Sequence, residues 1–420
     1  MRPGQKHTLG GVAAVIFSGL FLLTFFDNAL AQETATGKKF GSSLDRLKWD
    51  RKKGVAVDKK PENEAARKKS DATSEGDAVR IVTALAVFDL LVINRQGALV
   101  AGLSKEDFVV TEDGVPQQVG MFALGDNATL PRSIVLIIDY SRSQHTYLQT
   151  SIAAAKVLVE QLGPKDQMAI VTDDVVLLQD FTFDKARLKQ SLDGLLEKAL
   201  RKKKFGDSEQ YSALLATLRE LLAEADRPIV IFQTDGDQLQ YLQTAGKTPH
   251  EWVEDRFANF SFADVIATVK RKQATVYSII SGIRLLGLTP DEQFERGRQV
   301  LANLNAGWVS GPSFEGVQRQ LSPLERQRFY QRMIARLVQQ QEALAKVALA
   351  SGGWYGFLER PDDAATLYEQ ILNDINRRYV LGYYPTNETR DGGLRKVHFE
   401  VRGHPEYVIV GKRSYYAPAQ

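Results

Sequence analysis

The sequence predicts an α/β protein with a doubly wound, mostly parallel sheet covered by helices on both faces, and a small antiparallel β module. The stretches "IVLIID" (134–139), "RPIVIFQTDGD" (227–237) and "ATVYSIIS" (274–281) contain long apolar runs, as in strands buried on both faces of a parallel sheet. Amphipathic helical stretches separate these runs, and this alternation is typical of a doubly wound sheet. Shorter strand-like runs with glycine turns flank the region on both sides and predict the β module.

Composition limits the possible classes of protein. The chain has 420 residues, of which 44% are hydrophobic and 25% charged, enough for a large core in two or three domains. The formal net charge of +3 is small and no long basic cluster occurs, which argues against a nucleic-acid partner. The chain has no cysteine, so it has neither a disulfide nor a lipid-bearing cysteine.

The first 31 residues have the pattern of a secretory signal peptide. Arg2 and Lys6 precede an apolar stretch at 9–26, and the small residues Ala29 and Ala31 then form an A-x-A cleavage site. We expect cleavage after Ala31, no membrane span in the mature chain, and a secreted or periplasmic location. The alternative is a retained anchor, because the apolar stretch is close to the shortest spanning length.

Residues 32–78 are rich in charged residues and serine, and predict a disordered charged linker, because so little apolar surface cannot offset the entropy of ordering. Residues 79–130 predict the first part of the β module. The turns at 94–97 and 112–114 contain the glycines that hairpins require.

Residues 131–360 predict the α/β domain, with a helical insertion rich in Arg and Gln at about 283–336. The expected strands are 134–139, 167–173, an edge-type strand at 175–182, 227–235, 274–281 and 354–359. The expected helices are 148–162, 184–199, 211–225, 262–271 and 333–350. Residues 361–420 predict a helix at 364–378 and then strands that complete the β module, so that the α/β domain is inserted between its two halves.

Polar residues gather where two of the buried strands end. In doubly wound sheets, ligands bind outside the carboxyl ends of the strands, and Asp139 and Asp235 both lie there. Ser141 and Ser143 follow Asp139 directly. Carboxylates and hydroxyls without cysteine or histidine suit a hard cation, Mg²⁺ or Mn²⁺. The alternative is that these residues only cap the following helix.

"DYSRS" (139–143) resembles the D-x-S-x-S motif of the von Willebrand factor type A domain, and "TDGD" (234–237) is similar to its second acidic loop. The resemblance implies a Rossmann-like fold with a metal-ion-dependent adhesion site, in which the serines bind the ion directly and the acidic residues act mostly through water. Its third element is a threonine. In "GDSEQYSAL" (206–214), Ser208 falls at that position, and Ser212 is a possible substitute.

The flanks extend the resemblance to about 79–418. "LSKEDFVVTEDGVPQQV", "YVLGYYPT", "RKVHFEVR" and "GKRSYYAP" are similar to the β segments of secreted bacterial VWFA-related proteins. The resemblance implies a protein-interaction module whose metal takes an Asp or Glu carboxylate from a partner protein. The implied metal site is Asp139, Ser141, Ser143, Ser208 and Asp235.

Two other functions remain as alternatives. One is a Mg²⁺-dependent hydrolase, but Ser141 stands where a D-x-D nucleophile pair needs its second Asp, and no hydrolase or phosphate-binding motif occurs. We therefore expect no enzymatic activity. The other is a structural envelope protein with a degenerate metal site, an alternative that Ser208 in place of Thr leaves open. We interpret Asp173, Asp174 and Asp237 as loop carboxylates.

Overall fold

The computed structural model describes residues 37–58, 85–127, 130–201, 208–223, 225, 227–244, 257–304 and 322–419. The expected signal peptide at 1–31 lies outside these residues. Residues 59–84 also lie outside them; they include the end of the expected linker (59–78) and the start of the expected β module (79–84). Within the described ranges, none of the helices is both long and apolar enough to cross a membrane.

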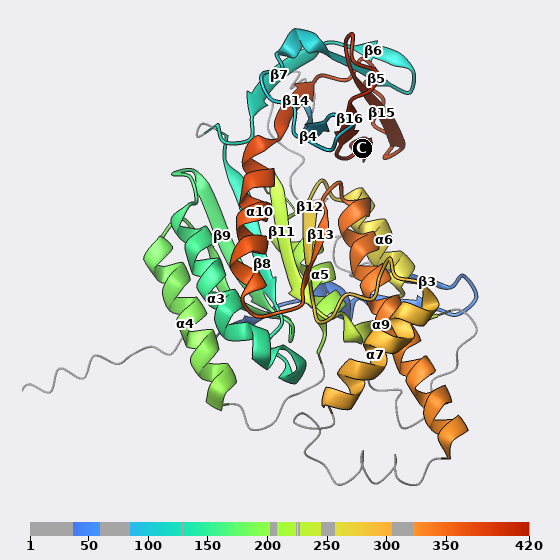
Figure 1. Ribbon diagram of the computed structural model, residues 1–420. Helices are drawn as coiled ribbons and strands as arrows, with labels where there is room; N and C mark the ends of the chain where they lie inside the picture. Colours follow the sequence, from blue (N-terminus) through green and yellow to red (C-terminus); the bar gives the residue numbers. More distant parts are fainter. Residues whose placement is uncertain are drawn as a thin grey trace, which may run out of the picture. The chain divides into compact units, whose positions relative to one another are not determined.

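A seven-stranded sheet forms the centre of the α/β part, in the order β1-β10-β9-β8-β11-β12-β13 (Figure 1). Strands β9, β8, β11, β12 and β13 are mutually parallel, whereas β10 and β1 are antiparallel at one edge. Apart from β1, the chain order across the sheet is 3-2-1-4-5-6, that of Rossmann-like folds. The strands are β1 Lys38–Lys39, β8 Arg132–Ile138, β9 Asp166–Thr172, β10 Val176–Thr182, β11 Pro228–Thr234, β12 Thr275–Ser281 and β13 Tyr355–Leu358. The predicted fold class is confirmed.

Helices cover both faces of the sheet. Successive residues of β8 enter opposite cores: Leu136 packs with α3, α4 and α10, while Ile137 packs with α5, α6 and α9. This explains why the strand is apolar at every position from Ile134 to Ile138. The helices are α3 His145–Glu160, α4 Lys185–Arg201, α5 Gln210–Ala216, α6 Phe262–Arg271, α9 Pro323–Ala350 and α10 Asp363–Arg377.

Two helix boundaries differ from the predicted ones by more than three residues. Helix α5 ends at Ala216, and the chain continues as a π-helical turn over Thr217–Leu221. Helix α9 begins ten residues before position 333, because Ser322 and Glu325 form a capping box around Pro323. Within the expected insertion at about 283–336, α7 at Pro290–Leu304 packs on the first half of α9, and residues 305–321 lie outside the described ranges.

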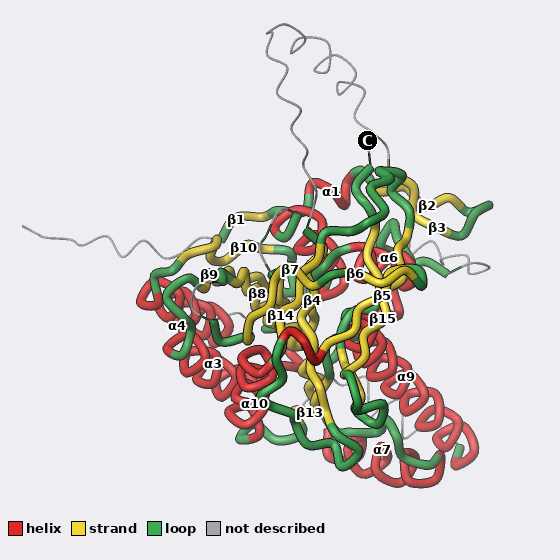
Figure 2. The backbone as a smooth tube through the Cα atoms, turned by 90° about the horizontal axis from the view of Figure 1, so that it is seen from above, coloured by secondary structure: helices red, strands yellow, loops and turns green. Residues whose placement is uncertain are grey.

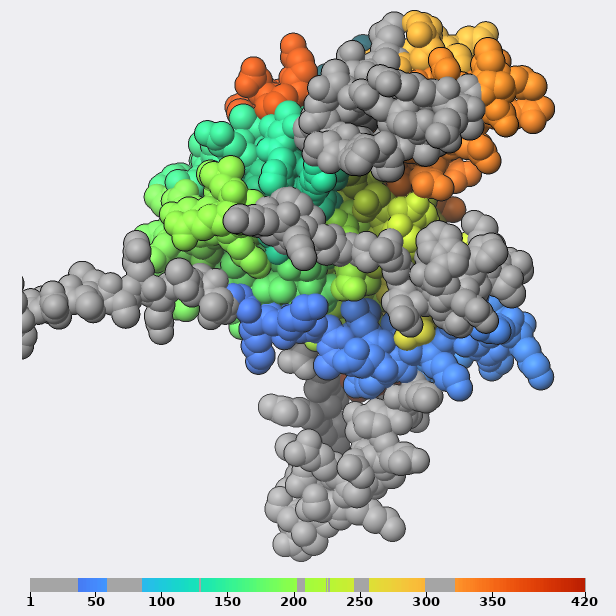
Figure 3. All heavy atoms as spheres, turned by 90° about the horizontal axis from the view of Figure 1, so that it is seen from below, coloured from blue at the N-terminus to red at the C-terminus, as the bar shows by residue number. Residues whose placement is uncertain are grey.

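The prediction of a disordered linker is wrong for residues 37–58. These residues form β1, α1 (Ser42–Asp45), β2 (Leu47–Asp50) and β3 (Val55–Asp58) along one side of the α/β part (Figures 2 and 3). Glu220 accepts hydrogen bonds from the backbone N–H groups of Gly41 and Ser43. The few apolar residues suffice because Leu47 packs into an existing core instead of forming a new one.

Two four-stranded antiparallel sheets pack face to face as a β sandwich, in the orders β16-β4-β14-β7 and β17-β15-β5-β6. Both flanks of the α/β part contribute strands, as predicted. The strands are β4 Ala86–Ile93, β5 Phe108–Glu112, β6 Val115–Gln117, β7 Val119–Leu124, β14 Tyr379–Tyr383, β15 Leu394–Val401, β16 Val408–Val410 and β17 Ser414–Tyr416. Phe88 and Phe399 meet edge to face across its core, with ring centroids 5.1 Å apart.

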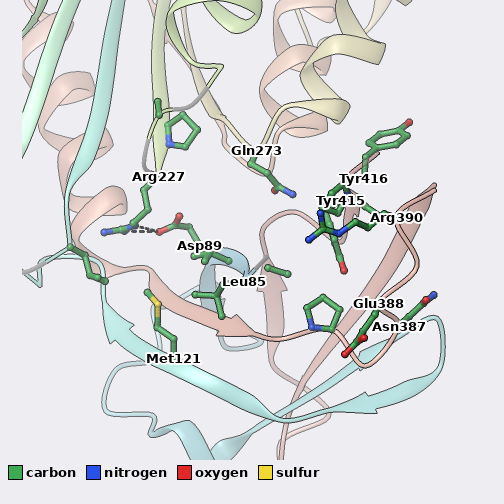
Figure 4. Close-up of a pocket in the computed structure, with 18 of the residues that line it drawn as sticks. Leu85, Asp89, Met121, Arg227, Gln273, Asn387, Glu388, Arg390, Tyr415 and Tyr416 are labelled. Carbon is green, nitrogen blue, oxygen red and sulfur yellow. Dashed lines mark hydrogen bonds and ion pairs between the residues drawn. The ribbon is translucent and has the colours of Figure 1, made fainter. Parts of the chain in front are cut away.

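A cavity of about 700 Å³ lies where the sandwich meets the amino ends of the parallel strands (Figure 4). Leu85 and Met121 line it from the sandwich, and Gln273 lines it from the segment between α6 and β12. Arg227, which precedes β11, donates to Asp89 Oδ1 of β4 from Nε at 3.1 Å and from Nη2 at 2.6 Å. This ion pair joins the two parts of the fold at the end opposite the candidate site.

Candidate functional site

Three aspartates follow three neighbouring strands at the carboxyl edge of the sheet. Asp139 follows β8, Asp173 follows β9 and Asp235 follows β11, and β8 lies between the other two strands. The backbone N–H of Asp139 donates to the Gln233 carbonyl oxygen at 3.1 Å, which extends the pairing of β8 and β11 to the start of the loop. The sheet therefore brings these carboxyl groups to one place.

Asp139 is the most enclosed of the predicted ligands, with 1% of its surface exposed. Its Oδ1 accepts the backbone N–H of Ser141 at 2.9 Å. Its Oδ2 accepts the Thr234 hydroxyl at 2.8 Å and the Gln210 side-chain amide at 3.0 Å. These donors come from three different segments and fix the carboxylate in position.

The two predicted serines lie side by side. Their hydroxyl oxygens are 3.1 Å apart, with Ser141 buried and Ser143 exposed. Ser141 is the N-cap of the short 3₁₀ turn at Arg142–Gln144, but its side chain makes no capping hydrogen bond. Helix capping therefore does not account for this hydroxyl.

Asp235 is linked to this hydroxyl pair through Gln144. The amide nitrogen of Gln144 donates to Asp235 Oδ2 at 3.0 Å and to the Ser143 hydroxyl at 3.3 Å. Burial, followed by the nearby charges of Asp237 and Asp139, raises the pKa of the Asp235 carboxyl to about 8. A cation beside Asp235 would oppose this effect by favouring the ionised carboxylate.

Ser208 is connected to the loop that carries the serine pair through Asp173. Its hydroxyl donates to Asp173 Oδ2 at 3.1 Å, while Asp173 Oδ1 accepts the Tyr140 backbone N–H at 3.1 Å. Burial and the Asp139 charge raise the pKa of Asp173 well above its ordinary value. Ser208 therefore supports the loop that carries Asp139 through an aspartate that we had interpreted as a loop carboxylate.

Ser212, the possible substitute for Ser208, forms a hydrogen bond with another residue. Its hydroxyl accepts the Gln238 side-chain amide at 2.8 Å. The oxygen of the same amide accepts the backbone N–H groups of Tyr211 and Ser212, at 2.6 and 3.1 Å. Gln238 thus binds the amino end of α5, and Ser212 belongs to that arrangement.

The ligand types fit a hard divalent cation. Two adjacent hydroxyls and two carboxylates offer only oxygen atoms, as Mg²⁺ and Mn²⁺ prefer. Among the residues that the structure describes, no group of three or more His, Cys, Asp or Glu is arranged to hold a metal. A cation here would depend on the serine hydroxyls, which carry no charge, and we therefore expect modest affinity.

Sequence reasoning did not identify Gln144 and Gln210, and it interpreted Asp173 only as a loop carboxylate. Asp173 could have been found, because it follows an apolar strand in the same way as Asp139 does. The two glutamines have no comparable signal, since nothing in their spacing shows that their amides reach the carboxylates.

No protein-family model matches the sequence, and no curated protein matches it. Solved structures that match include the von Willebrand factor domain of the pili tip protein Mfa5 from Porphyromonas gingivalis, which is 15% identical with a TM-score of 0.35 over 59% of this chain and 95% of that chain. An aerotolerance-related membrane protein from Bacteroides fragilis is 14% identical with a TM-score of 0.32, over 59% of this chain and 98% of that chain.

Proximal thread matrix protein 1 from the mussel byssus is 13% identical with a TM-score of 0.36, over 63% of this chain and 49% of that chain. These TM-scores are low, and the similarities carry no information on the chemistry of the site. The strand order and the helices on both faces agree with a von Willebrand type A-like fold.

Proposed function

We propose that this chain is a metal-dependent protein-interaction module that binds a partner through a divalent cation at the carboxyl edge of the sheet. The observation that carries the proposal is the pair of hydroxyls, Ser141 and Ser143, 3.1 Å apart beside the carboxyl groups of Asp139 and Asp235. Their partly open position suits a ligand that arrives from outside.

Asp139, Ser141, Ser143 and Asp235 would hold the cation, and Ser208 would support Asp139 through Asp173. When bound, the cation, Mg²⁺ or Mn²⁺, supplies a coordination position for a carboxylate oxygen of an Asp or Glu on the partner. The residues of the chain have a positioning role: the Ser141 backbone N–H and the Thr234 hydroxyl fix Asp139, and the 3₁₀ turn presents Ser143 at the surface.

The proposal includes a secreted or periplasmic location and no enzymatic activity. The location rests on the signal-peptide pattern at 1–31, with cleavage after Ala31. The absence of activity rests on the ligand set, because a hydroxyl at Ser141 replaces the second carboxylate that a D-x-D hydrolase needs.

A second candidate function is a structural envelope protein that keeps the fold without the metal. The observation that favours it is the engagement of predicted ligands by other protein groups: Ser208 with Asp173, and Asp139 with the amide of Gln210. The two candidates differ in whether a divalent cation binds at all.

Calorimetric titration of Mg²⁺ and of Mn²⁺ into the mature chain, residues 32–420, tests the proposal. We expect binding that is lost in an Asp139→Ala, Ser141→Ala double variant. Ser133→Ala is the matched control, because Ser133 is a buried serine at the other end of β8, bonded to Gln167 at 3.0 Å, and should leave binding intact. A folded parent that binds neither metal would favour the structural role.

A further inference from the structure

Gln210 occupies a place among the carboxylates that no feature of the motif explains. It is the first residue of α5 and is completely buried. Its amide nitrogen donates to Asp139 Oδ2 at 3.0 Å and to Asp237 Oδ1 at 2.6 Å. One amide group therefore joins the acidic loop after β8 to the acidic loop after β11.

The orientation of this amide is fixed by its other atom. Gln210 Oε1 accepts the backbone N–H of Gln238 at 3.1 Å, and the Gln238 side chain in turn binds the amino end of α5. Turning the Gln210 amide over would place its oxygen against two carboxylates and its nitrogen against an N–H donor. The N–H₂ group is consequently held toward Asp139 and Asp237.

Gln144 repeats this arrangement on the other side of the site and provides a second, independent observation. Its amide nitrogen donates to Asp235 and to the Ser143 hydroxyl. Its Oε1 is buried and has no hydrogen-bond partner in the described part of the chain. A buried acceptor left unpaired costs free energy, so the Gln144 amide is also held with its nitrogen toward the acidic loop at the expense of its oxygen.

We propose that Gln210 is an internal substitute for the cation: its amide holds the Asp139 and Asp237 loops together without metal and competes with metal for Asp139. The inference rests on the proposed function. An amide N–H₂ has two donors and a partial positive charge, so it can satisfy two carboxylates, but more weakly than a divalent ion does.

The competition has a consequence for how the site works. A cation that coordinates Asp139 has to replace the buried, charge-assisted hydrogen bond from the Gln210 amide. The chain alone therefore binds metal weakly. A partner carboxylate that joins the coordination sphere adds the missing stabilisation. Gln210 thus acts as a positioning residue that couples metal binding to partner binding.

Two variants at this one position test the inference, with metal affinity measured by calorimetry and thermal stability measured with and without Mg²⁺. Gln210→Met removes the donors at similar length and adds no metal ligand. We expect Mg²⁺ to bind it about tenfold more tightly than the parent, since a hydrogen bond to a charged group is lost only from the metal-free state. Gln210→Lys keeps a donor and adds a charge, and should weaken Mg²⁺ binding by at least about tenfold.

Thermal stability separates competition from simple damage to the fold. Without metal, Gln210→Met should melt below the parent, and saturating Mg²⁺ should remove most of that difference. Gln179→Ala is the matched control: Gln179 is also buried, but it bonds to Asp180 and Ser191, and it should lower the melting temperature equally with and without Mg²⁺.

Each outcome has a defined meaning. Opposite shifts in Mg²⁺ affinity for the Met and Lys variants would support the inference. Equal affinity in the parent and both variants would overturn it and leave the proposed function standing. If the folded parent and folded Gln210→Met both fail to bind Mg²⁺ and Mn²⁺, the proposed function itself fails and the inference with it.

Discussion

The raised pKa of Asp235 predicts that metal affinity depends steeply on pH. Burial and two neighbouring carboxylates raise this pKa to about 8, from about 3.9 for a free aspartate. Below pH 8 the Asp235 carboxyl group holds a proton. A cation that coordinates the carboxylate has to displace this proton. Each pH unit below 8 then weakens apparent affinity about tenfold, so that binding at pH 6 should be about 100-fold weaker than at pH 8.

Calorimetry at pH 6, 7 and 8 measures this dependence. Titrations in buffers of different ionisation enthalpy also count the protons released, and we expect about one per cation at pH 6 and fewer at pH 8. Asp235→Asn is the control, because it removes the titrating group: its affinity at pH 8 should be lower than that of the parent but nearly independent of pH. An affinity of the parent that is the same at pH 6 and pH 8, without proton release, would refute the reasoning.

Three further predictions concern stability. Without metal, the chain should be more stable to urea at pH 5.5 than at pH 8, because between about pH 4 and 8 the folded state keeps the Asp235 proton that the unfolded state loses; equal stability would contradict this. Leu344→Ala should cost about 3 kcal/mol in urea unfolding, since Leu344 is completely buried in α9 against Gly236 of the acidic loop, and a loss well below about 1 kcal/mol would contradict that packing. Asp89→Ala should cost about 3 kcal/mol because it leaves the buried Arg227 guanidinium unpaired, and Asp89→Leu combined with Arg227→Met should cost less; a larger loss in the double variant would oppose this account.

The elements that sequence reasoning predicted best are those with strong local signals. Helix α6 has the expected bounds because Ser261 and Asp264 form a capping box at its start and its apolar residues share one stripe. Strand β8 was evident because it is apolar at every position from Ile134 to Ile138, which follows from cores on both of its faces. The β sandwich followed from alternation, as in β15, whose residues are buried at every second position.

Features that depend on contacts between distant segments could not be predicted. Residues 37–58 contain few apolar residues and were therefore predicted to be disordered. Their sequence could not show that Leu47 packs into a core formed by another part of the chain. Spacing placed a hydroxyl at Ser208 but could not show that it turns to Asp173. Gln210 gave no signal, since its role depends on the arrangement of Asp139 and Asp237, which meet only in the folded chain.

The central claim is that a divalent cation binds beside Ser141 and Ser143, and anomalous scattering from Mn²⁺-soaked crystals tests it most directly. We expect a strong anomalous peak in contact with both serine hydroxyls, with the amide of Gln210 moved away from Asp139. A map with no peak at this edge, and the Gln210 amide still between Asp139 and Asp237, would contradict the claim and favour a structural role for the fold.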